Sequence, residues 1–351
     1  MDDKIDRWVL RKTIHGEVYY DRNTGVSIRN YQNNEVSDNR NYWSLPTFEL
    51  EAPLKVYFDF TYLCNLECRH CITNSSPRIN RESELRTDRI EAIIDELASI
   101  GVLEVCIGGG EPLCHHDLFP ILTYAYGLKL NVVITTNGTL VTPEIAKLFQ
   151  ELNIFEVHVS FDGSKPIHDN IRGAGCYQKA LEAVSLLNNK GVKTIPRLTL
   201  CNDDRSGLDS FMKDLRSVGS TIIKVSLIES VGRGSLEKNK DLFKYARDET
   251  TVNLLLEIAQ NNGLILKLPP DLAPAAELAD RYELLENKKR CGAGLETAYI
   301  SPKGAVQFCS ATPNNIFGSV KTNSFMSVWT NNYAKVWRSR EFCLNCPCLS
   351  T

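Results

Sequence analysis

The sequence lacks a run of about 18 apolar residues, the length that a membrane-spanning helix needs. Residues 1–7 are mostly charged, so we expect no signal peptide. The net charge is only −3 and its signs are mixed, which leaves no basic stripe for nucleic acid. Internal repeats, low-complexity segments and a dinucleotide GxGxxG motif are also missing. These absences predict a cytoplasmic protein with neither a membrane nor a nucleic-acid partner.

Cysteine, in contrast, is abundant, with twelve residues in a chain of 351. In a cytosolic protein, clustered cysteines indicate metal binding rather than disulfides. Three lie within residues 64–71 and three within residues 343–348. Four further cysteines are isolated in the sequence and are more typical of buried packing residues: Cys106, Cys114, Cys176 and Cys201.

Hydrophobic residues make up 43% of the chain, enough for one large domain or for a main domain with small appendages. Residues 1–29 have apolar positions and turn residues typical of a small β-hairpin or meander. The Asn-rich residues 30–46 are typical of a linker.

From Leu54 onward, the pattern predicts strands that alternate with amphipathic helices. The predicted strands are residues 55–61, 102–107, 128–135, 154–160, 192–200 and 221–228. The predicted helices between them include residues 88–98, 143–151, 177–188 and 207–217. Six such units predict an α/β fold with a parallel sheet, curved or partly closed into a barrel. Ligand loops are then expected at the carboxyl ends of the strands.

Beyond residue 230, a looser pattern predicts a small C-terminal extension. It predicts a long helix at residues 241–261, a short strand and a helix at about 274–289. A hairpin is expected at residues 297–301 and 305–309, and a last helix at about 324–338.

Three cysteines follow the first predicted strand with C-x3-C-x2-C spacing: Cys64, Cys68 and Cys71. Thiolates bind the irons of iron–sulfur cubes, normally four per cluster. Three thiolates can serve three irons and leave the fourth open to a substrate. A structural zinc site is the alternative, but zinc needs a fourth protein ligand and usually paired C-x2-C knuckles.

This segment resembles the hallmark of the radical S-adenosylmethionine (SAM) superfamily. The resemblance implies a partial (β/α)6 TIM-like barrel and a [4Fe–4S] cluster whose open iron binds SAM. It also implies cleavage of SAM to a 5′-deoxyadenosyl radical that abstracts a hydrogen atom from the substrate.

The resemblance continues over residues 54–230 and implies the residues that contact SAM. A Gly-Gly-Glu-Pro loop closes the second strand, and polar residues end the third and fourth strands. By resemblance, the SAM-binding residues are His70, Gly109, Gly110, Glu111, Asn137, Ser160, Asp162 and Arg172. For His70 and Arg172, an ordinary solvated loop position is the alternative.

The C-terminal cysteines form a second constellation, and the sequence around them resembles SPASM and the shorter twitch extensions. The resemblance implies an auxiliary [4Fe–4S] cluster, with structural zinc as the alternative. The expected ligands are Cys291, Cys309, Cys343 and Cys346, and Cys348 could replace Cys346. Because a full SPASM extension carries more cysteines, we expect one auxiliary cluster, in a truncated extension. Residues 232–234, Gly-Arg-Gly, resemble the Gly-Arg turn that precedes such extensions.

Many relatives with this extension modify ribosomally made precursor peptides by crosslinking, epimerisation or backbone excision. The expected function is therefore maturation of a precursor peptide. The alternatives are a radical SAM dehydrogenase for a small molecule or a protein side chain, and a non-enzymatic electron carrier. The strands near the N-terminus could be a remnant of a leader-binding module or a sheet edge that accepts a peptide, or they could extend the main sheet.

The expected partners are the precursor peptide, a separate leader-binding protein, and an electron donor of the flavodoxin or ferredoxin type. Four regions are expected along the chain. They are an N-terminal β-segment with a linker (1–50), a radical SAM core (51–235), connecting helices (236–290) and an auxiliary-cluster domain (291–351).

Overall fold

The computed structural model describes residues 7–13, 16–25, 27–31, 50–201, 205–243, 249–268, 293–312, 314–332 and 334. Within these residues, a ten-stranded sheet has the order β10-β9-β8-β7-β6-β5-β4-β11-β12-β13, and a three-stranded sheet lies apart from it. None of the described helices is long and apolar enough to span a membrane.

Parallel strands form the centre of the large sheet and confirm the predicted α/β fold. These strands are β4 (Lys55–Thr61), β5 (Glu104–Gly109), β6 (Asn131–Thr136), β7 (Glu156–Phe161), β8 (Thr194–Leu200) and β9 (Ile222–Leu227). A short strand, β10 (Ile265–Lys267), continues the parallel sheet beyond β9.

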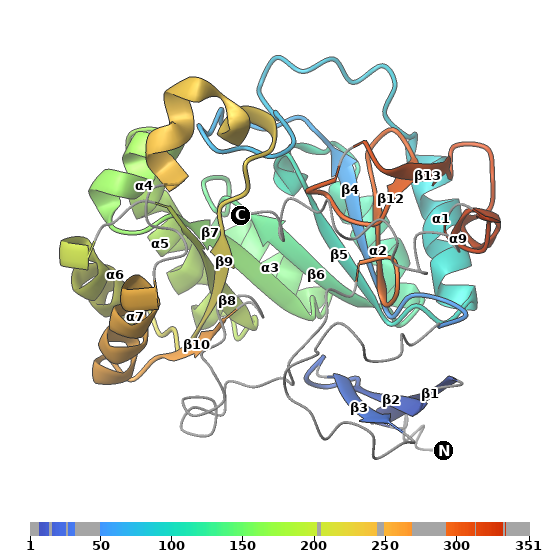
Figure 1. The fold of residues 1–351 in the computed structure, drawn as a ribbon, viewed down its shortest axis with the longest axis horizontal. Helices are drawn as coiled ribbons and strands as arrows, with labels where there is room; N and C mark the ends of the chain where they lie inside the picture. Colours follow the sequence, from blue (N-terminus) through green and yellow to red (C-terminus); the bar gives the residue numbers. More distant parts are fainter. Residues whose placement is uncertain are drawn as a thin grey trace.

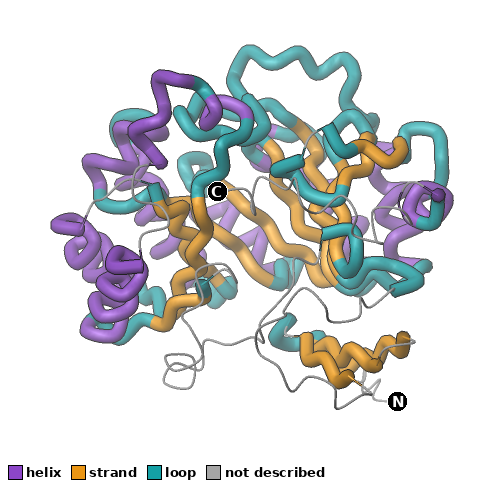
Figure 2. Tube along the Cα trace, viewed as in Figure 1, coloured by secondary structure: helices purple, strands orange, loops and turns teal. Residues whose placement is uncertain are grey.

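Side chains alternate between the two faces of this sheet, as the period of a β-strand requires. On β4, Val56, Phe58 and Phe60 are fully buried in the core that the helices share. Lys55 and Tyr57 point to the opposite face, which we call the inner face. The helices are α1 (Thr87–Ser99), α2 (Leu118–Gly127), α3 (Pro143–Glu151), α4 (Lys165–Arg172), α5 (Cys176–Asn189), α6 (Arg205–Ser217) and α7 (Glu249–Asn261), and Figures 1 and 2 show their arrangement.

The helix at Pro143–Glu151 begins where its sequence signals place it. Thr142 accepts a hydrogen bond from the backbone N–H of Ile145, and Pro143 occupies the first turn. The helix predicted over 241–261 is partly wrong, because Glu237–Phe243 forms 3-10 turns (η4) and α7 begins at Glu249. The helix predicted at about 274–289 lies outside the described residues.

The C-terminal extension continues the main sheet. The strand β11 (Thr297–Ile300) pairs in parallel with β4, and β12 (Ala305–Gln307) and β13 (Ile316–Ser319) follow in antiparallel order. The predicted hairpin is therefore confirmed, whereas its attachment to β4 was not predicted. The last described helix, α9 (Phe325–Trp329), buries Phe325 and Trp329 completely.

The N-terminal segment forms the separate sheet of β1 (Trp8–Thr13), β2 (Gly16–Asp21) and β3 (Ser27–Tyr31). The alternative that these strands extend the main sheet is wrong, and the last strand runs into the segment expected as linker. Tyr20 donates a hydrogen bond to Glu104 (3.0 Å), and Arg11 donates one to the carbonyl of Gly101 (2.9 Å). Because Glu104 begins β5, the small sheet packs at the amino ends of the parallel strands, below the main sheet in Figure 1.

We predict that this docking depends on the hydroxyl group of Tyr20. Replacing Tyr20 with Phe removes a buried hydrogen bond to Glu104 and should lower the free energy of unfolding by about 1–2 kcal/mol. The matched control is Tyr19→Phe, because the Tyr19 hydroxyl bonds to Glu17 within the small sheet's own strand. Chemical denaturation of both variants provides the measurement. Equal stability of the two variants would contradict the proposed docking.

Candidate active site

The loop that follows β4 carries the three cysteines of the first motif. Cys64 and Cys68 are buried, Cys71 is partly buried, and all three are free thiols. Burial is the largest influence on both buried thiols; it raises the pKa of Cys64 to about 12 and that of Cys68 to about 11. The backbone N–H of Leu66 also points at the Cys64 sulfur, at 3.4 Å. Three thiols gathered in one loop fit the donor set of an iron–sulfur cube with one open iron.

Two glycines at the end of β5 allow this loop to pack directly against backbone. A Cβ atom on Gly110 would lie 2.2 Å from the carbonyl oxygen of Leu63, and one on Gly109 would lie 2.4 Å from that of Thr61. The N–H of Gly110 donates to the Thr61 carbonyl at 2.9 Å. No residue with a side chain fits at either position, which explains the Gly-Gly pair physically.

The side chain of Glu111 is fully buried and joins two strand ends. Its carboxylate accepts hydrogen bonds from the Thr136 hydroxyl (2.7 Å), the N–H of Asn137 (2.8 Å) and the N–H of Leu113 (3.2 Å). Burial raises its pKa, and these donors oppose that effect. The carboxylate is thus used inside the protein, so the predicted contact of Glu111 with SAM would have to come from its backbone.

Asp162, at the end of β7, is the centre of a buried charge network. Arg172 binds both oxygens of Asp162, at 2.5 and 2.9 Å, and His70 Nε2 lies 2.9 Å from one of them. Burial opposes ionisation of Asp162, yet Arg172 and His70 hold its pKa well below the usual range. The other ring nitrogen of His70, Nδ1, is buried and has no hydrogen-bond partner among the described residues. An unpartnered buried nitrogen beside the cysteine loop fits a ligand-binding position.

The predicted SAM-binding residues converge on the cysteine loop. The side-chain amide of Asn137 lies 3.9 Å from the Cys64 sulfur. Arg172 and Asp162 are close enough to Cys68 to change the pKa of its thiol, which Arg172 lowers and Asp162 raises. Ser160 is the next-to-last residue of β7, on the inner face. The structure brings these residues together at the carboxyl ends of β4 to β7. Their contacts with SAM stay predictions.

Comparisons with known proteins agree with this geometry. Residues 58–215 match the radical SAM superfamily, and residues 291–347 match SPASM, an iron–sulfur cluster-binding domain. Mycofactocin maturases MftC of Mycolicibacterium smegmatis and Mycobacterium ulcerans are 32% and 30% identical to this chain. These matches cover 74% and 78% of this chain, and 65% and 73% of the two maturases.

The chain belongs to the radical SAM superfamily.

Two further similarities concern other members. Fe-coproporphyrin III synthase of Methanosarcina barkeri is 29% identical over 76% of this chain and 71% of its own length. The Streptococcus suis protein SuiB bound to S-adenosylmethionine has the same fold, with a TM-score of 0.73 and 17% identity over 98% of this chain and 93% of SuiB. SuiB bound to the precursor peptide SuiA gives a TM-score of 0.71 and 16% identity over 98% and 92%.

The Gly-Arg turn contacts the cysteine loop of this radical SAM protein near Cys71, whereas Gly110 contacts the loop near Leu63. The turn begins a 3-10 helix, η3 (Gly232–Ser235). Arg233 donates from Nε to the Cys68 carbonyl (2.7 Å) and from Nη2 to the Ser75 carbonyl (2.8 Å), and its N–H donates to the Cys71 carbonyl (2.9 Å). The motif was recognised in the sequence, but its partners are backbone carbonyls, which leave no sequence signal.

A second group of residues was missed in the sequence. Tyr299, from the extension, donates to the carboxylate of Asp59 on β4 and lies 3.1 Å from the hydroxyl of Tyr62. Burial raises the pKa of Asp59 to about 7, and the bond from Tyr299 opposes the rise. The extension thus supplies a hydrogen bond to the radical SAM core beside the cysteine loop.

Of the predicted auxiliary ligands, only Cys309 lies among the described residues. It follows β12, is partly buried, and accepts from the N–H of Ala311 at 3.4 Å. Cys291, Cys343, Cys346 and Cys348 lie outside the described residues. Among the cysteines predicted to be packing residues, Cys106, Cys176 and Cys201 are buried, whereas Cys114 is partly exposed.

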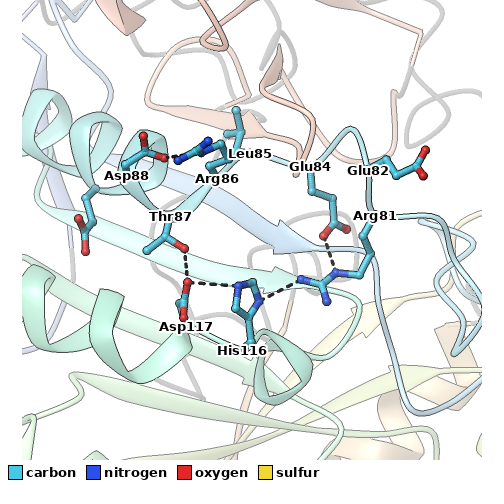
Figure 3. Close-up of a pocket in the computed structure, with 10 residues that line it drawn as sticks. Arg81, Glu82, Glu84, Leu85, Arg86, Thr87, Asp88, His116 and Asp117 are labelled. Carbon is cyan, nitrogen blue, oxygen red and sulfur yellow. Dashed lines mark hydrogen bonds and ion pairs between the residues drawn. The ribbon is translucent and has the colours of Figure 1, made fainter.

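A pocket of about 650 Å3 lies between the segment before α1 and the start of α2 (Figure 3). Ion pairs between lining residues include Arg81 with Glu84 at 3.0 Å and His116 with Asp117 at 3.2 Å. Glu84 also accepts a hydrogen bond from the hydroxyl of Thr61 (2.9 Å), so a residue that lines the pocket is bonded to the last residue of β4. None of the predicted SAM-binding residues lines it, and we do not assign the active site to it.

The clamp by the Gly-Arg turn gives a specific prediction. Gly232 has φ of +60°, and a Cβ atom there would lie 2.4 Å from the Cys71 carbonyl oxygen. We expect Gly232→Ala to displace the loop and to lose most of the iron bound there after anaerobic reconstitution. Gly191 is the matched control, because its φ is +73° but a Cβ atom there would have no neighbour within 4 Å. Gly191→Ala should cost about 1 kcal/mol of stability and leave iron binding intact. The same iron content in both variants would contradict the clamp.

Proposed function

We propose that this radical SAM protein modifies a precursor peptide by crosslinking, epimerisation or backbone excision. The observation that carries the proposal is the similarity to MftC maturases over 74% of this chain. The radical SAM and SPASM matches support the two cluster sites that such a maturase would need. The chain spans about two-thirds of the length of the first of these relatives, 65%. The likeness to SuiB, a protein crystallised with a precursor peptide, concerns the fold alone.

In this proposal, Cys64, Cys68 and Cys71 hold a [4Fe–4S] cluster, and the predicted strand-end residues hold SAM. When bound, the two cofactors supply a strong hydrogen-abstracting radical. The protein's own part is to fix the cysteine loop by backbone packing, and to hold Asp162 ionised beside it through Arg172. An auxiliary cluster would be held by Cys309 together with the C-terminal cysteines. It would lie in the proposed auxiliary-cluster domain, residues 291–351.

The N-terminal sheet offers a place to hold the peptide away from the reacting residue. In the described sheet, β1 and β3 each have one neighbour, so both have a free edge that could accept an extended peptide strand. This sheet packs at the amino ends of the parallel strands, whereas the cysteines lie at the carboxyl ends. A strand as long as β4, seven residues, extends about 23 Å. A peptide bound to the small sheet would therefore need at least about seven extended residues to reach the site.

A second candidate function is modification of a small molecule. The similarity to Fe-coproporphyrin III synthase, over 71% of that protein, favours a porphyrin substrate as the alternative. Either function would require an electron donor of the flavodoxin or ferredoxin type, and peptide modification could also use a separate leader-binding protein. We place these reactions in the cytosol.

Removing the three cysteines of the first motif tests the cluster assignment. Replacing Cys64, Cys68 and Cys71 together with Ala should remove about four of about eight irons per chain and abolish SAM cleavage. The remaining iron should stay, because the auxiliary site uses other cysteines. Iron analysis and 5′-deoxyadenosine production after anaerobic reconstitution provide the measurements. Continued production of 5′-deoxyadenosine by this variant would overturn the assignment.

Co-expression with short open reading frames next to the gene tests the peptide substrate. We expect a mass change in one peptide with the wild type and none with the triple cysteine variant. Deleting residues 1–46 should lower this modification at least about tenfold, while SAM cleavage without peptide falls much less. Iron content of the truncated protein is the control for folding. Equal loss of both activities would mean that the strands only support the fold, and turnover of a porphyrin with no peptide change would favour the alternative.

A further inference from the structure

From the amino ends to the middle of its strands, the inner face of the sheet carries five basic side chains and two carboxylates. At the amino ends, Lys55 forms an ion pair with Glu104 (3.0 Å), and Lys193 forms one with Glu156 (3.0 Å). Both carboxylates are therefore already neutralised by a lysine. Three cations on this face have no carboxylate partner among the described residues: Arg197 on β8, Lys224 on β9 and Lys267 on the edge strand β10. Lys267 is exposed, whereas Arg197 and Lys224 are partly buried.

Arg197 and Lys224 are neighbours that lack an anionic partner. They are directly paired in the parallel register of β8 and β9. Arg197 donates from Nε to the Ser226 hydroxyl at 3.0 Å, which places both strands' side chains on the same face. Within the part of the chain that the structure describes, neither cation has a carboxylate within ion-pair distance, and Lys224 has no hydrogen bond. Both side chains are partly exposed, so a ligand can reach them, and a bound anion would supply the counter-charge that the described residues do not.

The pair lies next to the predicted SAM site. Ser160 on β7 is paired in register with Arg197, which in turn is paired with Lys224, so the three residues form one row across three strands. Tyr57 on β4 is 42% exposed and also faces this region. Burial raises the pKa of its hydroxyl, and the nearby charge of Arg197 opposes that rise. The Tyr20 contact with Glu104 lies at the opposite, amino ends of the strands. A ligand at the row would thus lie between the N-terminal sheet and the cysteine loop.

The electrostatics of Lys224 agree with an unfilled anion position. Burial, followed by Arg197 and Lys55, lowers the pKa of Lys224 to about 8, and Glu156 and Cys106 oppose this only in part. His158, which contacts Glu156, has its own pKa lowered to about 4 by burial and is neutral near pH 7. A carboxylate bound close to Lys224 would raise the pKa of its amine back toward the ordinary value of a lysine.

We propose that Arg197 and Lys224 bind a carboxylate of the substrate, one strand away from the residues assigned to SAM. The proposal rests on the peptide-modifying function above and deepens it: the modified peptide carries an acidic side chain or its own C-terminal carboxylate beside the reacting carbon. The planar guanidinium of Arg197 matches a carboxylate, and the Lys224 amine adds a second donor. The carboxylate of SAM is the competing source, because Ser160 lies in the same row.

Lysine labelling tests the anion site without knowledge of the peptide. The reconstituted full-length protein is labelled with acetic anhydride between pH 6 and 11, and mass spectrometry follows Lys224 together with Lys267, its exposed register neighbour on β10. Propionate, in the presence of SAM, should raise the pKa of Lys224 by about 1 or more. Propionamide should leave it unchanged, and no addition should affect Lys267.

Three results would overturn the inference. A full rise of the Lys224 pKa with SAM alone would assign the pair to the carboxylate of SAM. A rise with inorganic phosphate but not with propionate would exclude the carboxylate class. An ordinary, unresponsive pKa in all samples would mean that the pair is simply solvated.

The second measurement uses a precursor peptide identified by co-expression. Arg197→Gln and Lys224→Met should lower the ratio of modified peptide to SAM cleaved by about tenfold to a hundredfold, the effect of losing one charge-assisted hydrogen bond. Arg197→Lys should recover part of this ratio, and the matched control Lys267→Met should keep it. An unchanged ratio in the first two variants would contradict the role of the pair. If no peptide is modified by the wild type, the proposed function fails, while the labelling experiment still decides whether the anion site exists.

Discussion

Backbone packing of residues 61–72 between two glycine-containing turns is the constraint on which the candidate site depends. Gly110 contacts the Leu63 carbonyl near the start of the loop, and Gly232 contacts the Cys71 carbonyl near its end. At both places, a Cβ atom would lie within 2.5 Å of a backbone oxygen. The loop position is therefore set by main-chain contacts, and the cysteine side chains remain free to bind irons. Arg233 adds hydrogen bonds to the carbonyls of Cys68 and Cys71, so the Gly-Arg turn restrains the second and third cysteines of the motif.

Charges are distributed unequally along the inner face of the sheet. At the amino ends, each carboxylate is paired with a lysine, and the N-terminal sheet packs against one of these pairs through Tyr20. At the carboxyl end of β7, Asp162 is saturated by Arg172 and His70. The unpaired cations occur between these two levels. Buried charges are costly unless they are paired, and the carboxylates of the two outer levels are paired. The cations of the middle level are partly exposed, so they are available to a ligand.

The strands and the main site could be predicted because their signals are local. The alternation of apolar residues in β4 fixes its bounds, and the cysteine spacing and the Gly-Gly-Glu-Pro loop follow strand ends directly. The helix Leu118–Gly127 was missed because it is apolar on most sides and shows little periodicity. The pairing of β11 with β4 joins segments about 240 residues apart, and no local pattern reports such pairing. For the same reason, the sequence does not show that Arg197 and Lys224 are neighbours.

The C-terminal extension pairs with β4, the first strand of the parallel series, and this pairing has a chemical consequence. Without β11, β4 would be an edge strand with unpaired backbone groups next to the cysteine loop. The same pairing places Tyr299 against Asp59, which packs under Gly108 and Gly109. Because burial raises the pKa of Asp59 to about 7, its folded-state pKa exceeds the unfolded value, and its ionisation disfavours the folded state increasingly as pH rises from about 4 to about 7. The Tyr299 hydroxyl counteracts this by donating to the carboxylate. The extension therefore influences how much negative charge lies beneath the glycine loop assigned to SAM, independently of any cluster that the extension itself binds.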